Sequence, residues 1–275
     1  MITAEKKFQL TPNNYYTNEA NWHYQSKSWF TKFEECEAEA LAELKGEYKD
    51  TSSNDTPLIA GNYLHSYFES KEAHETFLES HKKDIFKYGN PEKGIKSDYL
   101  IIEKCINKLN KDPYFPRLYQ GEKEVIVTGE IYGVNWMGKV DCLDLNRKLF
   151  FDLKTVDKIH KGHWSSEQHK KLNFAQSRQY DMQMAVYKEL IKQTFGVECE
   201  PIIIAVSKEN EPDLMAISIP QYLMDFNMEQ IKEKQPHIQA VIEGEEKPNV
   251  CGRCSYCRAN KTLDVITPLD EIEIE

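Results

Sequence analysis

The stretch that decides the fold is GKVDCLDLNRKLFFDLKT, residues 138–155, where the apolar pattern has the two-residue period of β-strands. Asp141 lies near the end of one predicted strand, the chain turns at residues 146–147, and Asp152 and Lys154 lie on the returning strand. Side chains two residues apart in a strand share a face, so Asp152 and Lys154 project together. The sequence therefore predicts a hairpin on which two carboxylates and one ammonium group converge.

Two carboxylates and a lysine in this arrangement suit metal-dependent hydrolysis of a phosphodiester. The carboxylates hold a divalent ion that activates water and neutralises charge on the phosphate, while the lysine orients or deprotonates the attacking water. Phe151 and Leu153 indicate a buried strand, where an unpaired acid would be costly, and Gly138 leaves room for a ligand to approach. The spacing alone also fits an ordinary hairpin with an exposed Asp–Lys pair.

A helix predicted for residues 173–195 places two amides and a phenol on one face. Gln179, Gln183 and Tyr187 follow one another at four-residue spacing, which suits hydrogen bonding to a phosphate backbone. A neighbouring stripe is expected to face the core, and it consists of Tyr180, Met184 and Ile191. If the preceding hairpin is disregarded, the pattern is more typical of a polar surface residue at Gln183 and an aromatic residue at the edge of the core at Tyr187.

The remaining pattern predicts one α/β domain over residues 1–275, with a core of about 57–220. Besides the helix above, helical spacing indicates helices over residues 28–45, 57–82 and 221–242. Strands are expected as three antiparallel segments between 122 and 156, a buried segment at 201–206 and a further one at 214–219. These elements predict a mixed sheet flanked by helices.

The charge balance limits the classes of partner. With 35 basic and 45 acidic residues, the net charge of -10 argues against a protein that coats nucleic acid through its overall field, but it permits local binding. Residues 154–171 hold five lysines and three histidines, so an anionic substrate is sought there, although a solvated loop fits the charge equally well.

The apolar runs and the cysteines indicate the compartment. The longest apolar run, residues 202–206, is far below the roughly 20 residues of a membrane-spanning helix, and the N-terminal sequence lacks the apolar region of a signal peptide. Seven cysteines, an odd number, favour reduced thiols over disulfides. We therefore expect a cytoplasmic protein without a membrane partner.

The order of these motifs resembles a known superfamily. A helix with His65 in GNYLH, the hairpin with Asp141 and Asp152-Leu153-Lys154, and the helix with Gln183 and Tyr187 resemble the PD-(D/E)XK nucleases of the RecB/RecE type. The resemblance is greatest to phage-encoded, RecE-like exonucleases that work with a single-strand annealing protein. It implies a restriction-endonuclease-like core, with a mixed central β-sheet flanked by helices.

The resemblance also implies roles for individual residues. His65, Asp141, Asp152 and the Leu153 carbonyl would bind Mg²⁺ or Mn²⁺. Lys154 would be the catalytic lysine. Gln183 and Tyr187 would position the metal-bound water and the scissile strand.

The activity that the resemblance implies is that of a Mg²⁺-dependent deoxyribonuclease, an exonuclease acting on double-stranded DNA ends in phage-type DNA recombination, with a possible homo-oligomeric ring. The alternatives are an iron-sulfur endonuclease or adaptation-type nuclease, and a non-catalytic DNA-binding or assembly module.

The C-terminal tail, about residues 248–261, carries a second motif. Cys251, Cys254 and Cys257 have C-x2-C-x2-C spacing, which lets three thiolates converge on one centre. One early and three late cysteines resemble the iron-sulfur staple of AddB-type and CRISPR-associated adaptation nucleases, so Cys36 is the candidate fourth ligand of a 4Fe-4S cluster. Zn²⁺ with Cys36 or His237 as fourth ligand, or a reduced tail without metal, are the alternatives. The other thiols are expected in the core, and they are Cys105, Cys142 and Cys199.

Overall fold

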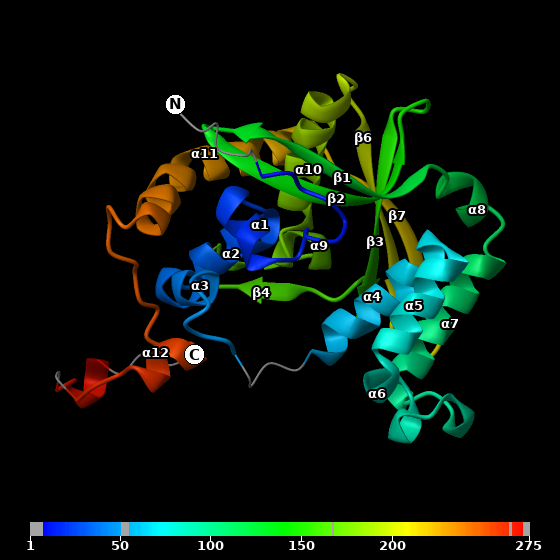
Figure 1. Ribbon diagram of the computed structural model, residues 1–275, viewed down its shortest axis with the longest axis horizontal. Helices are drawn as coiled ribbons and strands as arrows, with labels where there is room; N and C mark the ends of the chain where they lie inside the picture. Colours follow the sequence, from blue (N-terminus) through cyan, green and yellow to red (C-terminus); the bar gives the residue numbers. More distant parts are fainter. Residues whose placement is uncertain (1–7, 51–54, 167, 264–265, 272–275) are drawn as a thin grey trace, which may run out of the picture.

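The computed structural model describes residues 8–50, 55–166, 168–263 and 266–271. Its centre is a five-stranded sheet in the order β1-β2-β3-β6-β7 (Figure 1). The strands are β1 Glu122–Ile131, β2 Val134–Asp144, β3 Leu149–Val156, β6 Glu200–Ser207 and β7 Leu214–Ser218. All neighbours are antiparallel except β3 and β6, which are parallel. This mixed sheet confirms the expected α/β class and all five expected strands.

The middle strand, β3, is covered on both faces. Phe150 packs into one hydrophobic cluster, and Phe151 and Leu153 pack into a second cluster on the opposite face. The parallel partner β6 requires a crossover connection, which contains α10 (Tyr180–Phe195). Because β3 lies between two covered faces, Asp152 is only 1% exposed although it is a carboxylate.

Helices form a layer on each side of the sheet, as expected for a restriction-endonuclease-like core. One layer consists of α10, α11 (Gln221–Glu243), α2 (Lys27–Glu35) and α3 (Glu37–Leu44). The other consists of α4 (Thr56–Glu69), α5 (Lys71–Ser80) and α7 (Ser97–Lys111). Figure 1 shows the N-terminal helices and the α4–α7 group on opposite sides of the strands. Residues of β2 and β3 that lie between the two groups of helices can therefore share a site with residues from both groups.

Three helices that the sequence predicts as continuous are interrupted in the structure. The breaks fall at Cys36, Ser70 and Gln179, within the helices expected for residues 28–45, 57–82 and 173–195. Cys36 and Ser70 are extended, and Gln179 has a φ of 51°. Ser70 caps the next helix, because its Oγ accepts a hydrogen bond from the Ala73 N–H at 3.0 Å. Apolar periodicity continues through such breaks, so it does not reveal them.

Several elements have no counterpart in the sequence-based expectation. They are α1 Asn18–His23, α6 Lys82–Ile85, α7, α8 Phe115–Leu118 and the short hairpin of β4 His163–Ser165 and β5 Lys170–Leu172. The first part of the helix expected at residues 173–195 forms the separate short helix α9 Phe174–Ser177. The tail contains the short helix α12 Ser255–Ala259, and 3-10 turns lie at Lys87–Gly89, Pro91–Lys93 and Leu269–Glu271. Among the described residues, no helix has the length and apolar character needed to cross a membrane. Residues 1–7, which carry part of the expectation about export, lie outside the described residues.

Candidate active site

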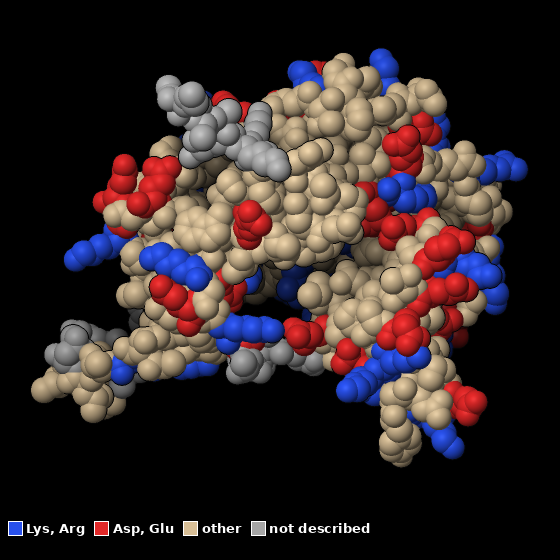
Figure 2. All heavy atoms as spheres, viewed as in Figure 1, with Lys and Arg blue, Asp and Glu red and all other residues tan. Residues whose placement is uncertain are grey.

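A cleft of about 940 Å³ opens where the β2–β3 ladder ends, between α4 and α10. Figure 2 shows this side of the molecule hollowed between the two groups of helices, with basic side chains visible deep inside. The expected site residues that line the cleft are His65, Asp141, Leu153, Lys154, Gln183 and Tyr187. Asp152 lies directly behind Lys154 and is buried. The structure thus brings together residues from one strand pair and two helices.

Asp141 is placed by the end of the strand pairing. The β2–β3 ladder stops at Cys142 and Phe151, so the next residue of β2 has no main-chain partner on β3. The Asp141 carboxylate takes that place, because its Oδ2 accepts a hydrogen bond from the Leu153 N–H at 2.7 Å. The expected role of Leu153 was a carbonyl ligand, and the contact that the structure shows is this N–H, which orients the acid.

Asp152 and Lys154 share a face of β3, as the two-residue spacing predicts. The Lys154 Nζ lies 2.9 Å from Asp152 Oδ2. The ammonium group of Lys154 is thus an ion-pair partner of Oδ2, whereas Oδ1 has no partner among the described residues. A buried carboxylate with unused lone pairs is costly unless a cation or a donor satisfies it. This observation fits a metal ligand.

His65 and Glu124 lie beside Asp141 and form with it a group of possible ligands that does not include Asp152. His65 Nδ1 lies 3.4 Å from Asp141 Oδ2 and has no hydrogen-bond partner in the described structure. Ligand atoms of His65, Glu124 and Asp141 all lie within 4.8 Å of one another. Carboxylate oxygens and an imidazole nitrogen suit Mg²⁺ or Mn²⁺, so these residues fit the expected divalent ion.

Sequence reasoning missed Glu124, although the register contains a signal for it. Lys123 pairs with Cys142 and Val125 with Val140, so the antiparallel register places Glu124 opposite Asp141. A φ of 53° at Glu124 interrupts the regular ladder there. Counting residue pairs outward from the β1–β2 turn would have placed Glu124 opposite Asp141. The positive φ of Glu124, however, cannot be predicted from the alternation of apolar and polar residues.

Burial dominates the electrostatics of the cluster. Burial raises the pKa of Asp141 to about 7, against the opposing effect of Lys154. It also raises the pKa of Asp152 and lowers that of His65. Burial lowers the pKa of Lys154 as well, but attraction to Asp152 and Asp141 outweighs it, so that pKa lies above its ordinary value. Without a metal, burial therefore shifts both acids toward the neutral form, while Lys154 stays charged.

Two of the three polar residues expected in a row on α10 face the cleft. The Gln183 Nε2 donates a hydrogen bond to the Tyr187 Oη at 3.0 Å. Gln179 instead contacts α2, because its Oε1 accepts from the Thr31 hydroxyl at 2.8 Å and its Nε2 donates to Glu34. Only Gln183 and Tyr187 of the expected row therefore share a face, because α10 begins after Gln179, which has a left-handed conformation.

Two further expectations about this region require correction. Tyr180 was expected to face the core, and it packs there in part, but it also lines the cleft, with Lys154 Nζ 4.7 Å from the centre of its ring. Gly138 was expected to admit a ligand. A Cβ at Gly138 would lie 2.7 Å from the Tyr187 ring, so the room that glycine leaves is filled by that ring.

Basic side chains surround the acidic centre. The cleft lining includes Lys27, Lys158, Arg178 and Lys208. The Lys27 Nζ donates to the Arg178 carbonyl oxygen at 3.0 Å, and burial together with Lys154 lowers the pKa of Lys27 to about 8. Of the basic stretch expected at residues 154–171, Lys154, Lys158 and His163 line the cleft.

The four cysteines predicted to share a centre lie together. Sulfur atoms of Cys36, Cys251, Cys254 and Cys257 are all within 4.8 Å of one another. His237, the alternative fourth ligand, lies elsewhere in the network, because its ring nitrogens contact Glu37 at 2.9 Å and Glu246 at 2.7 Å. The remaining thiols are buried as expected, and they are Cys105, Cys142 and Cys199.

Among solved structures, the chain resembles one over nearly its full length. It is a crystal structure of a protein from Eubacterium rectale that has been proposed to be an exonuclease, with 30% identity, a TM-score of 0.86 and coverage of 95% of this chain and 97% of that chain. The structure of SSO0001 matches with 15% identity and a TM-score of 0.30 over 84% of this chain and 92% of that chain, which is too low to bear on the fold. No protein of curated function matches the chain.

A family model covers the fold and both clusters. The model for a PDDEXK-like domain of unknown function (DUF3799) matches residues 26–260. This range contains the acidic centre with Lys154, the polar residues of α10 and all four clustered cysteines. The chain belongs to this PDDEXK-like family, as its sheet, its buried acids and its lysine independently indicate.

Proposed function

We propose that the protein is a divalent-metal-dependent deoxyribonuclease that degrades linear double-stranded DNA from its ends. Membership of a PDDEXK-like family and the likeness to a protein proposed to be an exonuclease support nuclease chemistry. The observation that carries the proposal is the buried Asp152 beside Lys154 and Asp141, whose Oδ1 has no partner among the described residues. In an ordinary buried ion pair, both carboxylate oxygens would have donors within the fold.

The residues that would hold Mg²⁺ or Mn²⁺ are His65, Glu124, Asp141, Asp152 and the Leu153 carbonyl. A bound divalent ion supplies activation of water and neutralisation of charge that builds on the phosphate. The chain contributes the positioning of these ligands: the Leu153 N–H holds Asp141, and the strand pairing of β3 holds Asp152. Preorganised ligands of this kind avoid reorganisation during the reaction.

Lys154 is the proposed catalytic lysine. Its pKa lies above the ordinary value, so it is an ammonium group at neutral pH. In this state it orients the attacking water and stabilises negative charge on the phosphate, rather than removing a proton. Gln183 and Tyr187, joined by a hydrogen bond on α10, would position the scissile strand beside it.

Lys27, Lys158, Arg178 and Lys208 provide the local positive charge that the net charge of -10 does not. Basic groups at the entrance of a cleft attract the phosphate backbone and align it over the acids. Action at duplex ends, a single-strand annealing protein as partner, a role in phage-type recombination and a ring-shaped homo-oligomer follow from the resemblance to RecE-like exonucleases, and they are part of the proposal.

The decisive experiment incubates the purified chain with end-labelled linear duplex and with covalently closed circular duplex, with and without Mg²⁺. We expect degradation of the linear substrate only, and only with Mg²⁺. Cleavage of the circle would instead identify an endonuclease of the adaptation type. Binding without cleavage under all conditions would identify a DNA-binding or assembly module.

Variants connect the activity to the cleft. Lys154→Ala should lower the rate by about a hundredfold or more, because it removes charge stabilisation at the reacting phosphate. Lys192→Ala is the matched control, since Lys192 is a half-exposed lysine of α10 paired with Glu198 outside the cleft. Equal activity of the two variants would contradict the assignment of Lys154.

A further inference from the structure

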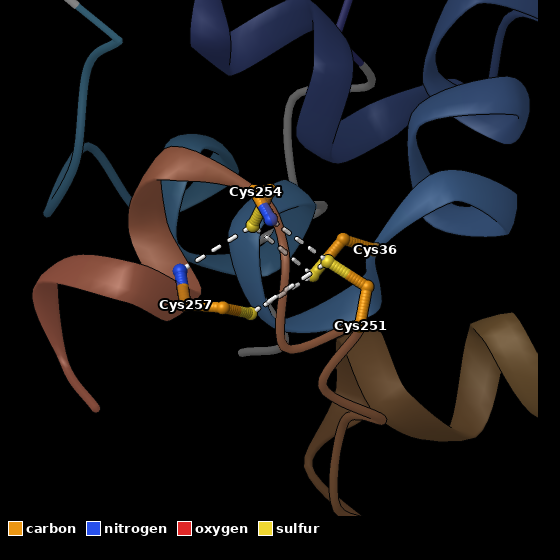
Figure 3. Close-up of side chains that lie close together, drawn as sticks. All are labelled: Cys36, Cys251, Cys254 and Cys257. Carbon is orange, nitrogen blue, oxygen red and sulfur yellow. Dashed lines mark hydrogen bonds between the residues drawn. The ribbon is translucent and has the colours of Figure 1, made fainter. Parts of the chain in front are cut away.

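Four cysteines from opposite ends of the chain converge on one point (Figure 3). Cys36 Sγ lies 3.6 Å from Cys257 Sγ and 3.7 Å from Cys254 Sγ, and Cys251 Sγ lies 3.9 Å from Cys257 Sγ. These separations are far longer than the bond of about 2.05 Å in a disulfide, so the four groups are free thiols. Figure 3 shows the four sulfur atoms directed toward one another rather than outward.

The backbone around the late cysteines is arranged for thiolates. The N–H groups of Arg253 and Cys254 point at Cys251 Sγ from 3.5 and 3.3 Å, and the Cys257 N–H points at Cys254 Sγ from 3.3 Å. Gly252 permits this tight loop with a φ of +72°, a conformation that side chains rarely adopt. Donors aimed at sulfur stabilise negative charge there, which a metal-ligating thiolate carries.

The opposite side of the cluster is fixed by Cys36. This residue is extended between α2 and α3, and it is only 5% exposed. Next to it, the Ala38 N–H donates to the Asn249 carbonyl oxygen at 3.1 Å, and Glu37 accepts the Asn249 N–H at 2.8 Å. Asn249, two residues before Cys251, therefore holds the tail against the start of α3 beside Cys36.

We propose that the four thiolates bind a single Zn²⁺ ion. Four sulfurs at about 2.3 Å from one central ion form a tetrahedron with edges of about 3.8 Å, which the three separations of 3.6, 3.7 and 3.9 Å match. A 4Fe-4S cluster binds each thiolate to a different iron at a corner of a cube, so its sulfurs must stand farther apart. The separations thus favour zinc over the iron-sulfur cluster that the spacing of the cysteines suggests.

The site is structural rather than catalytic. All four positions of the tetrahedron are filled by protein, which leaves none for water or substrate. None of the four cysteines lines the cleft. Because Cys36 and Cys254 are 218 positions apart, the ion joins the tail to the helix pair whose first member carries Lys27 and Trp29 into the cleft. Closing so long a loop disfavours the unfolded chain.

Metal analysis of the full chain, purified anaerobically without added metal, tests the proposal. We expect colourless protein with one zinc per chain and no labile sulfide. Cys254→Ser should lose the zinc, whereas Cys199→Ser should keep it, because Cys199 is a buried thiol outside the cluster. Brown protein with iron and sulfide, iron alone, or wild-type protein without metal would each overturn the proposal.

Cobalt exchange provides a second measurement that does not depend on a variant folding. Wild-type protein reconstituted with Co²⁺ should show the intense visible absorption of a tetrahedral tetrathiolate site, and stoichiometric Zn²⁺ should abolish it. Excess Mg²⁺ should leave the absorption unchanged, which separates this site from the acidic cleft. Weak absorption typical of octahedral Co²⁺, or loss of the signal with Mg²⁺, would contradict a four-cysteine site.

Discussion

Asp141 has an unusual proton affinity for a carboxyl group in a folded protein. Burial raises its pKa from 3.8 to about 7, so in metal-free protein the folded state retains a proton that the unfolded state releases near pH 4. Between these values the folded state binds more protons, and stability must fall as pH rises. Divalent metal reverses the preference, since a ligand must be deprotonated to bind.

The expected result is a pH-dependent melting temperature in the absence of Mg²⁺ and Mn²⁺. From pH 5 to 7 the contribution of Asp141 to unfolding free energy should fall by at most about 1.4 kcal/mol per pH unit, and it should level off above pH 7. Asp141→Asn has no such proton and should show a flatter profile. If the melting temperatures of wild type and Asp141→Asn depended on pH in the same way, the raised pKa would not belong to Asp141.

Glu124 is the acid that the sequence interpretation did not include. Its carboxylate lies with His65 and Asp141 and also forms an ion pair with Lys139. Glu124→Gln should therefore weaken Mn²⁺ binding by about tenfold or more, as measured by electron paramagnetic resonance titration. Glu130→Gln, on an exposed position of the same strand, is the matched control. Equal Mn²⁺ affinity of both variants would leave Glu124 as a partner of Lys139 only.

At the scale of single elements, the strands were predictable because a two-residue period and a polar turn specify a hairpin locally. The convergence of Asp141 with Asp152 and Lys154 follows from that hairpin alone. The helix breaks were not predictable, because Cys36 and Gln179 are set by contacts with distant segments. Gln179, for example, bonds Thr31 and Glu34 of α2 rather than continuing the polar row of α10.

Gly138 tests how closely β2 and α10 must pack. A Cβ there would lie 2.7 Å from the buried ring of Tyr187, so Gly138→Ala should push that ring away from Gln183 and cost about 1–3 kcal/mol of stability. Nuclease activity should fall with it. Gly61→Ala is the comparison, because its added Cβ would meet nothing within 4 Å in α4, and helix propensity predicts a small gain in melting temperature. Similar melting temperatures for both variants would contradict tight β2–α10 packing.

At the scale of the whole molecule, an acidic chain brings a few of its basic groups together in one cleft. Composition alone gives the net charge of -10, and only the fold shows that Lys27, Arg178 and Lys208 meet near Lys154. Lys27 begins α2, near the N-terminus, whereas Arg178 and Lys208 come from much later segments. The contact between Lys27 and the Arg178 carbonyl oxygen joins residues 151 positions apart, which no local pattern in the sequence specifies.

Lys27 offers a test of this convergence through pH and salt together. Since its pKa is lowered to about 8, it is mostly charged at pH 7 and mostly neutral at pH 9. If it contacts a phosphate, the affinity for linear duplex without divalent metal should fall over this interval. At pH 7, Lys27→Gln should reduce the slope of log affinity against log salt by about one.

Fluorescence anisotropy with a labelled duplex end measures both quantities. In Lys27→Gln the decrease in affinity between pH 7 and 9 should largely vanish, because the group that titrates in this range near the DNA is gone. Lys192→Gln removes an equal charge outside the cleft and should keep the wild-type slope and pH dependence. If both variants behave alike, the DNA does not contact Lys27, and the phosphate backbone must cross the acidic centre from the side of Lys158 and Lys208 instead.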